Sequence, residues 1–438
     1  MPEHIETAAF KRPGWWLRLP GKIAARLWGS AAALHAYWKY TRVPKENDLW
    51  VFTGFRGAVY MDNTKYFYEY VLKHHPEIRA VWLTRDEGVY NMLKSAGMPV
   101  ERMESPAGIK LASRAGIAVT DHFYVSDYTG RWGVNDATRI VQLWHGVGFK
   151  KMGDASGVRN TTERGVRYSG DILISAKDGA FTRFIKKIKY RLLAPFREKM
   201  EKYFLFLCPG REQVEMMAVP WSIPEKALFT AGQPRNLPLY ESAPQKSPAK
   251  ILYAPTYRFD PASERALIED FLANRQRIQQ KMEALDAVMY LRLHPHTWRD
   301  YSGLITPGLA ETDRVRALTE KDVYAFLGTF SVVISDYSSI SLDFAALDRP
   351  TVYFCPDYER FCREEAGLNG DFLASVPGPV TRNWGDTLAE TEKYLADPAK
   401  DSALRKEKCA YYFDPAVNNA SAAESIVQEL KKRLEPEV

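Results

Sequence analysis

Short apolar runs alternate with longer amphipathic stretches along most of the chain from residue 49 onward. The runs hold four to six residues and are rich in Val, Ile, Leu and aromatic side chains, which is typical of strands buried on both faces. In the first half the runs are residues 49–53, 80–84, 116–120 and 139–144, and the amphipathic stretches, which predict helices, are residues 63–74 and 87–96. Strands that alternate with helices predict a parallel sheet with helices on both faces.

A second series of the same kind begins after a stretch that contains several Pro and Ser residues and is typical of a linker, residues 238–250. The expected strands are residues 251–254, 288–293, 331–335 and 351–354, and the expected helices are residues 263–284, 339–347 and 420–434. The two halves show no sequence repeat, but they repeat one architecture. Because 438 residues are also too many for one ordinary hydrophobic core, the pattern predicts an α/β protein of two domains.

Basic residues cluster in two places, so the net charge of +6 is expected to produce strong local positive fields. Residues 11–42 contain seven Lys or Arg and no Asp or Glu, with Trp and Tyr between them, and residues 181–202 contain eight Lys or Arg against two Glu. Such segments suit the headgroup layer of an anionic membrane, where aromatic rings lie half dry and cations meet lipid phosphates. The alternatives are a helix packed on the protein's own surface for the first segment and a solvated cationic helix for the second.

The remaining composition predicts a peripheral protein on the cytoplasmic face of the cell membrane. No apolar run reaches the roughly 18 to 20 residues of a spanning helix, and the first residues lack a secretory signal. The four cysteines are far apart in sequence, so free thiols in a reducing compartment are expected. No Cys or His spacing typical of a metal site occurs, and no nucleic-acid recognition module follows the basic segment. We therefore expect no metal, no cofactor and no nucleic-acid partner.

Candidate chemistry is sought at the carboxyl ends of the strands, because ligands of open α/β sheets bind there. The last strand of the first series is followed by His145, Gly146 and Lys150, which place an imidazole beside open backbone and positive charge. Imidazole titrates near neutrality, so His145 can take a proton from an attacking hydroxyl group. A core histidine that bonds a carbonyl group is the alternative.

Three strand ends of the second half carry groups that suit an anion. Thr256 and Arg258 follow the first of these strands, and His294 follows the second at a turn that contains Pro. The third is followed by a hydroxyl-rich turn before a helix, with Asp336, Ser338, Ser339 and Asp343. Hydroxyls and free N–H groups at a helix start bind anions, and arginine offers a forked donor. A surface loop, a plain turn and a helix cap are the alternatives at the three places.

Together the four strand ends predict a ligand in the cleft between the domains, with a nucleotide diphosphate held by the second domain. His145 is expected to face this ligand from the first domain. No Asp-X-Asp motif occurs in the chain. Charge on a diphosphate is therefore expected to meet arginine, helix N-termini and hydroxyl groups instead of a metal ion.

Four motifs occur in an order that resembles the CDP-glycerol glycerophosphotransferase family, the primases and polymerases of teichoic acids and related capsules. They are QLWHG (142–146) with Lys150, YAPT (253–256) with Arg258, LRLHP (291–295), and DYSS (336–339) with Asp343. Similar stretches near residues 62–66 and 367–379 extend the resemblance over roughly residues 50–415. The chain departs from the family at Val147 and Gly148, where members often carry Thr-Pro.

The resemblance implies a GT-B fold, in which two Rossmann-like domains face each other, and attachment to the inner face of the cytoplasmic membrane. It also implies residue roles. His145 matches the proposed general base of the family, and His294 matches a second essential histidine near the donor phosphates. The other matches are donor-binding positions at Thr256, Arg258, Asp336, Ser338, Ser339 and Asp343, and acceptor-side or phosphate-binding positions at Gly146 and Lys150.

We therefore expect a basic aromatic membrane-associating segment (1–48), an acceptor domain (49–237), a linker (238–250), a donor domain that binds CDP (251–415) and a C-terminal helix (416–438). The expected reaction transfers a polyol phosphate, with glycerol phosphate favoured, from a CDP-activated donor to a hydroxyl of a lipid-linked or polymer acceptor, and releases CMP. A GT-B glycosyltransferase that uses a nucleotide sugar is the alternative, and a non-catalytic membrane scaffold is a second one. Glycerol and ribitol stay open, as do priming and polymerisation.

Overall fold

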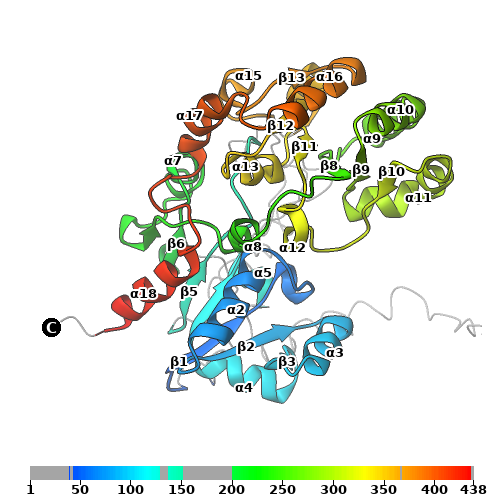
Figure 1. Cartoon of the computed structure of the whole chain (residues 1–438). Helices are drawn as coiled ribbons and strands as arrows, with labels where there is room; N and C mark the ends of the chain where they lie inside the picture. The colour runs from blue at the N-terminus through cyan, green and yellow to red at the C-terminus, as the bar shows by residue number, and fades with distance from the viewer. Residues whose placement is uncertain (1–38, 40–42, 129–136, 151–199, 366, 436–438) are drawn as a thin grey trace, which may run out of the picture.

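The computed structural model describes residue 39 and residues 43–128, 137–150, 200–365 and 367–435. Figure 1 shows two α/β domains, one above the other, with the first half of the chain in the lower one. The basic stretches at residues 11–42 and 181–202 lie almost entirely outside the described residues, so their membrane contact stays a prediction. Within the described parts of the chain, no helix combines the length and the apolar character that crossing a membrane requires.

The first domain is built on a seven-stranded parallel sheet in the order β3-β2-β1-β4-β5-β6-β7. Its strands are β1 (Glu46–Phe52), β2 (Arg79–Thr84), β3 (Val100–Arg102), β4 (Ala115–Thr120), β5 (Arg139–Gln142), β6 (Tyr203–Leu207) and β7 (Leu228–Phe229). The central strand β4 is buried at every residue, which explains its run of small and apolar side chains. One face packs on α2 (Asp62–His74), α3 (Glu87–Ser95) and α18 (Ala422–Leu434), and the other on α4 (Pro106–Arg114) and α5 (Tyr124–Asp127).

The second domain is built on a six-stranded parallel sheet in the order β10-β9-β8-β11-β12-β13. Its strands are β8 (Ala249–Ala254), β9 (Ala287–Leu291), β10 (Val315–Ala317), β11 (Val332–Ser335), β12 (Thr351–Phe354) and β13 (Val380–Thr381). One face packs on α9 (Pro261–Ala273), α10 (Arg275–Ala284), α11 (Pro295–Ala310) and α16 (Trp384–Ala396), and the other on α8 (Leu237–Glu241), α12 (Tyr324–Leu327) and α13 (Ser339–Ala345). Both sheets begin with the doubly wound order of a Rossmann-like domain, so the predicted α/β fold class is confirmed.

The C-terminal helix α18 belongs to the first domain in space, although it follows the second domain in sequence. Its apolar face, which includes Ile426, Val427 and Leu430, packs with Val71 of α2 in the core of the first domain. In Figure 1 the last part of the chain returns alongside the lower domain. The chain therefore passes between the two domains more than once.

Some local predictions differ from the structure. The helix expected over residues 263–284 is two helices, α9 and α10, which separate at Asn274. The Asn274 side chain bonds the main-chain oxygen of Asp270 at 2.9 Å, and such bonds compete with a continuous helix. The linker expected at residues 238–250 includes most of α8. Strands of two or three residues, such as β3 and β13, give no periodic signal, which is why they were not predicted.

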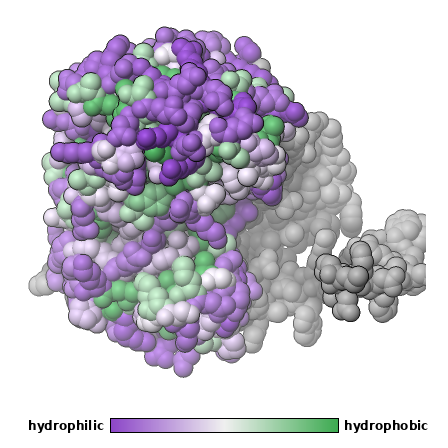
Figure 2. Space-filling model, turned by 45° about the vertical axis from the view of Figure 1, so that its right-hand side comes forward, coloured by the Kyte–Doolittle hydropathy of each residue, from purple (hydrophilic) through white to green (hydrophobic). Residues whose placement is uncertain are grey.

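The described surface carries few large apolar side chains. In the view of Figure 2 hydrophilic residues predominate, above all on the upper domain, and apolar residues gather in smaller areas between the domains and on the lower one. The exposed large apolar residues are spread over both domains: Phe55, Met92, Val219, Phe259, Leu304, Leu373 and Leu404. Single exposed apolar residues are common on water-facing surfaces, so the described surface does not by itself mark a membrane-binding face.

Candidate active site

A cavity of about 610 Å³ lies where the carboxyl ends of the two sheets meet. Its walls follow the ends of β5, β8, β9 and β11, as expected of open parallel sheets. Six residues predicted from the sequence line it: His145, Lys150, Thr256, His294, Ser338 and Ser339. Four others do not line it: Gly146, Arg258, Asp336 and Asp343. The structure therefore brings residues from four strand ends together and places the rest of the predicted set around them.

His145 enters the cavity from the first domain, shortly after β5. Its Nδ1 lies 3.1 Å from the main-chain oxygen of Asp121. A carbonyl oxygen only accepts hydrogen bonds, so Nδ1 of the neutral ring carries the proton and Nε2 keeps its lone pair. Burial, and after it the positive charge of His122, lowers the pKa of His145 well below its usual value. His145 is therefore a neutral base near pH 7, with its accepting nitrogen determined by the fold.

The main chain around His145 is held in an unusual conformation. The φ angle is 53° at Trp144 and 126° at Gly146, both in the region that side chains disfavour. The Asn63 side chain donates to the main-chain oxygen of Trp144 at 2.8 Å and holds the turn. A Cβ atom on Gly146 would lie 2.2 Å from Nη2 of Arg235. Gly146 therefore meets a conformational and a steric requirement of the turn.

Arg235 joins the two domains next to this turn. It is 2 % exposed, bonds Asp62 of α2 at 3.1 Å and forms an ion pair with Asp343 of α13. Its guanidinium also donates to the main-chain oxygen of His145 and lies 4.7 Å from the centre of the Tyr324 ring. Asp343 is thus engaged within the protein. Arg235 was not predicted from the sequence, because it follows the last strand of the first sheet in a stretch with no motif around it.

The chain between His145 and Lys150 crosses from the first domain to the second. Phe149 packs edge-on against Phe372, with ring centres 5.0 Å apart, and Lys150 pairs with Leu368 in an isolated bridge. Burial lowers the pKa of Lys150, and the opposing attraction of Asp336 only partly offsets this effect. Lys150 therefore brings positive charge from the first half of the sequence to the wall formed by the second domain.

His294 lines the cavity from the second domain, at the start of α11. Its Nδ1 accepts a hydrogen bond from the main-chain N–H of His296 at 3.2 Å. Nε2 of the neutral ring therefore carries the proton and can donate it to a ligand. Partial burial, followed by the charges of His296 and Lys150, lowers the pKa of His294 to about 4. The two histidines of the cavity thus have opposite tautomers, because His145 presents an acceptor and His294 presents a donor.

Two hydroxyl groups of the second domain lack the partners that such groups usually have. Oγ1 of Thr256 is buried and forms no hydrogen bond with the residues that the structure describes. The Ser338 side chain, at the start of α13, makes no capping bond to that helix. Buried polar groups are normally hydrogen-bonded, and exceptions call for a partner from outside the chain. Both hydroxyls line the cavity, where oxygens of a bound anion would be suitable partners.

Arg258 and Asp336 support this wall and do not line it. Arg258 is 1 % exposed and pairs with Asp336 and Asp357 at 2.7 Å each. Asp336 in turn accepts the main-chain N–H of Thr256 at 2.8 Å. In this arrangement the guanidinium fork of Arg258 is occupied by two carboxylates. Any effect of Arg258 on a ligand is therefore expected to act through the loop that carries Thr256.

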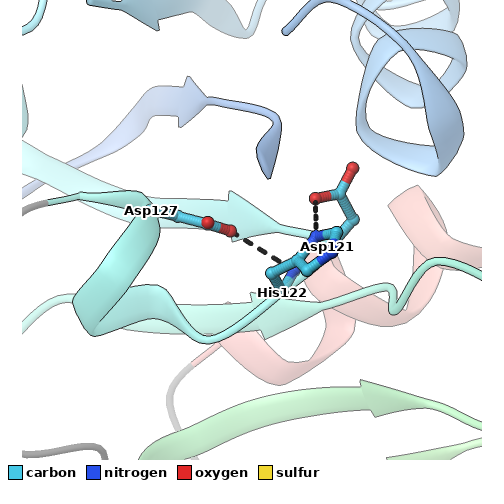
Figure 3. Close-up of side chains that lie close together, drawn as sticks. All are labelled: Asp121, His122 and Asp127. Carbon is cyan, nitrogen blue, oxygen red and sulfur yellow. Dashed lines mark hydrogen bonds and ion pairs between the residues drawn. The ribbon is translucent and has the colours of Figure 1, made fainter. Parts of the chain in front are cut away.

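A second imidazole beside His145 was missed in the sequence analysis. The ring of His122 stacks on that of His145, with centres 4.1 Å apart and planes 10° apart. Figure 3 shows His122 between two carboxylates: its Nδ1 lies 2.9 Å from Asp121, and its main-chain N–H donates to Asp127 at 3.3 Å. A signal was present, because Asp121 and His122 directly follow β4 and thus occupy a further strand end.

The ligand atoms of this trio, Asp121, His122 and Asp127, lie within 4.8 Å of one another, a spacing that a metal ion can use. The carboxylates are already engaged within the chain, however. Asp121 accepts the Thr64 hydroxyl at 2.8 Å, and Asp127 accepts the main-chain N–H of Arg56 at 2.8 Å. We therefore interpret the trio as a hydrogen-bonded network around His122. The expectation of a site without a metal stays a prediction.

Two doubly wound domains that meet at a cleft, with hydrogen-bonding groups at the facing strand ends, define a GT-B-like protein with a nucleotide-type site. The chain belongs to the family described as CDP-Glycerol:Poly(glycerophosphate) glycerophosphotransferase, whose sequence profile matches residues 36–432. The fold is similar to that of the wall teichoic acid polymerase TagF, with a TM-score of 0.63 and 20% identity over 96% of this chain and 98% of that one. The predicted family and GT-B-like fold are thus confirmed.

Two curated relatives of this chain differ in length. The chain is 22% identical to the teichoic acid poly(glycerol phosphate) polymerase of Staphylococcus epidermidis, over 86% of this chain and 49% of that protein. It is 23% identical to the teichoic acid glycerol-phosphate transferase of Staphylococcus aureus, over 90% of this chain and 95% of that protein. The chain therefore spans about half the length of the first and almost all of the second.

Proposed function

We propose that this protein transfers a polyol phosphate, with glycerol phosphate favoured, from a CDP-activated donor to a hydroxyl group of a lipid-linked or polymer acceptor, and releases CMP. The observation that carries the proposal is the chemistry of the two walls of the cavity. The first domain offers a neutral imidazole with an open acceptor nitrogen, His145. The second offers the Thr256 hydroxyl, which has no partner among the described residues, and the Ser338 hydroxyl, which makes no capping bond; membership of the family agrees with this division between the domains.

The donor diphosphate is proposed to lie against the second domain. Thr256 and Ser338 supply hydroxyl donors, and His294 supplies the N–H of Nε2. Lys150 adds a positive charge from the crossing segment. Hydrogen bonds to charged oxygens are about twice as strong as neutral ones, so these groups suit the oxygens of a diphosphate. Arg258 and Asp336 act behind them by holding the Thr256 loop.

The proposed step is an attack of the acceptor oxygen on the phosphorus that carries the polyol. The acceptor hydroxyl gives its proton to Nε2 of His145 as its oxygen forms the new P–O bond. The bond between that phosphorus and the oxygen bridging to the second phosphorus breaks, and CMP leaves with the bonding electron pair. His294 donates a hydrogen bond to the charge that develops on the leaving phosphate. The products are a phosphodiester on the acceptor and CMP.

The names of relatives support the class of donor and leave the polyol to experiment. One relative is a teichoic acid glycerol-phosphate transferase, and another, at 24% identity, is a teichoic acid ribitol-phosphate primase. A TagF variant with the same fold was soaked with CDPG. These names favour a CDP-polyol donor and a cell-wall polymer as acceptor.

A donor screen tests the proposed function. The purified full-length protein is incubated with a lipid-linked acceptor and one donor per reaction: CDP-glycerol, CDP-ribitol or a UDP-sugar. The masses of the lipid products are measured by mass spectrometry. We expect CMP and a product heavier by one or more glycerol phosphate units. Release of UDP with a sugar added would overturn the proposal in favour of a glycosyltransferase. The matched controls are His145→Ala, which should form product far more slowly, and His74→Ala on the exposed end of α2, which should form product at the normal rate.

We also propose that the protein binds the cytoplasmic membrane surface through its basic segments. The support is their composition, since residues 11–42 carry seven cations and no acidic residue. Each basic residue near an anionic surface contributes about 1 kcal/mol to binding. The protein should therefore sediment with vesicles of anionic lipid and not with vesicles of zwitterionic lipid. A variant with these seven cations replaced by Gln should bind the anionic vesicles more weakly, and equal binding of both proteins would contradict a role for residues 11–42.

A further inference from the structure

The stacked rings of His122 and His145 form a pair whose members face different surroundings. The ring centres are 4.1 Å apart and the planes are nearly parallel. Nδ1 of His122 bonds a carboxylate, Asp121, at 2.9 Å, whereas Nδ1 of His145 bonds the neutral main-chain oxygen of the same residue at 3.1 Å. A carboxylate stabilises an imidazolium far more than a carbonyl oxygen does. When one of the two rings is protonated, the extra proton is therefore expected on His122.

Charges from the surrounding elements reinforce this difference. The groups that act on the His122 ring and favour its charged form are carboxylates: Asp121, Asp127 and Asp62. Those that act on the His145 ring and disfavour its charged form are cations: His122, Arg235 and Lys150. The neighbouring 3-10 helix, Phe55–Gly57, adds the Phe55 ring at 4.5 Å from His122, with the Arg56 guanidinium 5.1 Å from the Phe55 ring. Burial raises the pKa of Asp127 to about 7 and that of Asp62 to about 6, so Asp121 provides the largest part of the effect on His122.

We infer that His122 is a positioning residue for His145: held as a cation by Asp121, it stacks on the His145 ring and keeps that ring neutral, with Nε2 free to take a proton. The part that concerns catalysis rests on the proposed function, whereas the coupling between the rings does not. His122 needs no contact with a ligand for this effect, because two like charges at 4.1 Å repel strongly in a partly buried site.

The pKa directions agree with the geometry. Burial acts against the charged form of His122, but the hydrogen bond and charge of Asp121, with Asp127 and Asp62, outweigh burial and raise the pKa of His122. Burial and the charge of His122 both lower the pKa of His145. As the pH falls, His122 should therefore gain its proton first, and His145 should stay neutral until the pH is far lower.

Two substitutions separate charge from packing. His122→Phe keeps an aromatic plane on His145 and removes the cation, so the pKa of His145 should rise by at least about one unit. His122→Arg keeps a planar group with a permanent charge, so the pKa of His145 should stay low. His74→Phe, on the solvent-exposed end of α2, is the control that should change nothing at His145.

The measurement is a pH titration of the full-length protein labelled with ¹³C-histidine, followed by NMR without donor or acceptor. The chain has eight histidines, and the signals of the pair are assigned by their loss in His122→Phe and His145→Gln. An upward shift of the His145 midpoint in His122→Phe but not in His122→Arg supports the inference. Equal shifts in both variants, no shift in either, or a downward shift in His122→Phe overturns it.

The wild-type protein offers a second test that does not depend on the stability of a variant. The inference requires the His122 signal to titrate at higher pH than the His145 signal. The reverse order would overturn it. Because no substrate is present, failure here leaves the proposed function standing, whereas failure of the donor screen leaves the coupling between the rings standing. In the active enzyme, the acidic limb of kcat/KM should move to higher pH in His122→Phe, as the His145 midpoint does.

Discussion

The two walls of the cavity differ in how completely their polar groups are partnered. On the first domain, His145, His122 and Asp121 form a closed set in which each ring has a partner for its Nδ1. On the second domain, the Thr256 hydroxyl is buried without a partner among the described residues, and the Ser338 hydroxyl makes no capping bond to its helix. A side chain that acts as a base at one nitrogen must already be held in the right orientation. A side chain that binds a ligand must instead keep a hydrogen-bonding group without a partner in the protein. The difference favours the proposed division, in which the first wall provides the base and the second wall binds the donor.

The two histidines express the same difference through their tautomers. His145 donates from Nδ1 to a carbonyl oxygen, and His294 accepts at Nδ1 from a main-chain N–H. The free nitrogen is therefore an acceptor on the first wall and a donor on the second. Substitutions that replace one kind of nitrogen but not the other test whether the two walls differ in this way.

The largest effect is expected at His145. His145→Ala removes the base and should lower kcat by roughly 10²- to 10⁴-fold, the usual contribution of a general base. Donor affinity, measured by calorimetry, should change little because the diphosphate is proposed to lie on the other wall. His145→Gln should be no better, since an amide cannot take the proton. Near-normal turnover of either variant would remove His145 from its proposed role.

A large effect on stability is expected where Arg235 joins the walls. Arg235→Ala leaves Asp343 buried without its cation, and breaking such a buried pair costs about 3 to 5 kcal/mol in the free energy of unfolding. Urea unfolding measures this loss. The control is Arg265→Ala, which breaks an exposed pair with Glu269 and should change stability by less than about 0.5 kcal/mol. Equal effects of the two variants would show that Arg235 does not hold the domains together.

An intermediate effect on the rate is expected at His294. Substitution by Gln should restore part of the rate at His294 but not at His145. His294→Ala should lower kcat by roughly 100-fold, as loss of one donor to a developing charge does. His294→Gln places an amide N–H near the position of Nε2 and should recover part of the rate. Steady-state kinetics of the two Gln variants, at His294 and His145, tests the comparison directly. Rescue at His145 and none at His294 would reverse the assignment of the walls.

A smaller effect on binding is expected at Thr256. Thr256→Val keeps the shape of the side chain and removes a hydroxyl that has no partner in the described protein. Loss of one hydrogen bond to a charged oxygen should raise the donor Kd by roughly ten- to a hundredfold. The melting temperature should not fall, because no bond within the protein is lost. A lower melting temperature with unchanged Kd would mean that the hydroxyl serves the fold.

The smallest change is expected in the pH profile of the unmodified enzyme. The base must be neutral, and burial with nearby cations lowers the pKa of His145. The acidic limb of kcat/KM should therefore lie below the usual imidazole value of about 6.5, and activity should change little between that value and neutrality. An acidic limb at or above the usual value would contradict the field described around His145.

The sequence predicted several parts of the fold that have strong apolar or periodic signals, although the buried run of β6 and the helices α11 and α16 were missed. The buried runs that became β1, β4 and β11, and the amphipathic stretch that became α2, appear within a few residues of their expected bounds. Very short strands escaped because two or three residues carry no period. The division of one expected helix at Asn274 escaped because it depends on a side chain bonding its own backbone.

The candidate site was predicted in part for a similar reason. Motifs at strand ends mark residues such as His145 and Ser338, because the carboxyl ends of parallel strands meet at one edge. Arg235 carries no such mark, since its role depends on meeting Asp343, more than a hundred residues away in sequence. His122 had a mark at the end of β4, but its effect depends on stacking with a ring from another strand end.

Periodicity and strand-end motifs are local properties of a chain, so the sequence alone predicted the two parallel sheets, the family and six of the residues that line the cavity. Only the tertiary structure decided which nitrogen each histidine presents, which charged groups face the cavity and which support it, and that α18 packs on the first domain. These properties depend on distances between segments far apart in sequence. Electrostatic and hydrogen-bonding energies fall steeply with distance, so they follow from the folded arrangement and not from the order of residues.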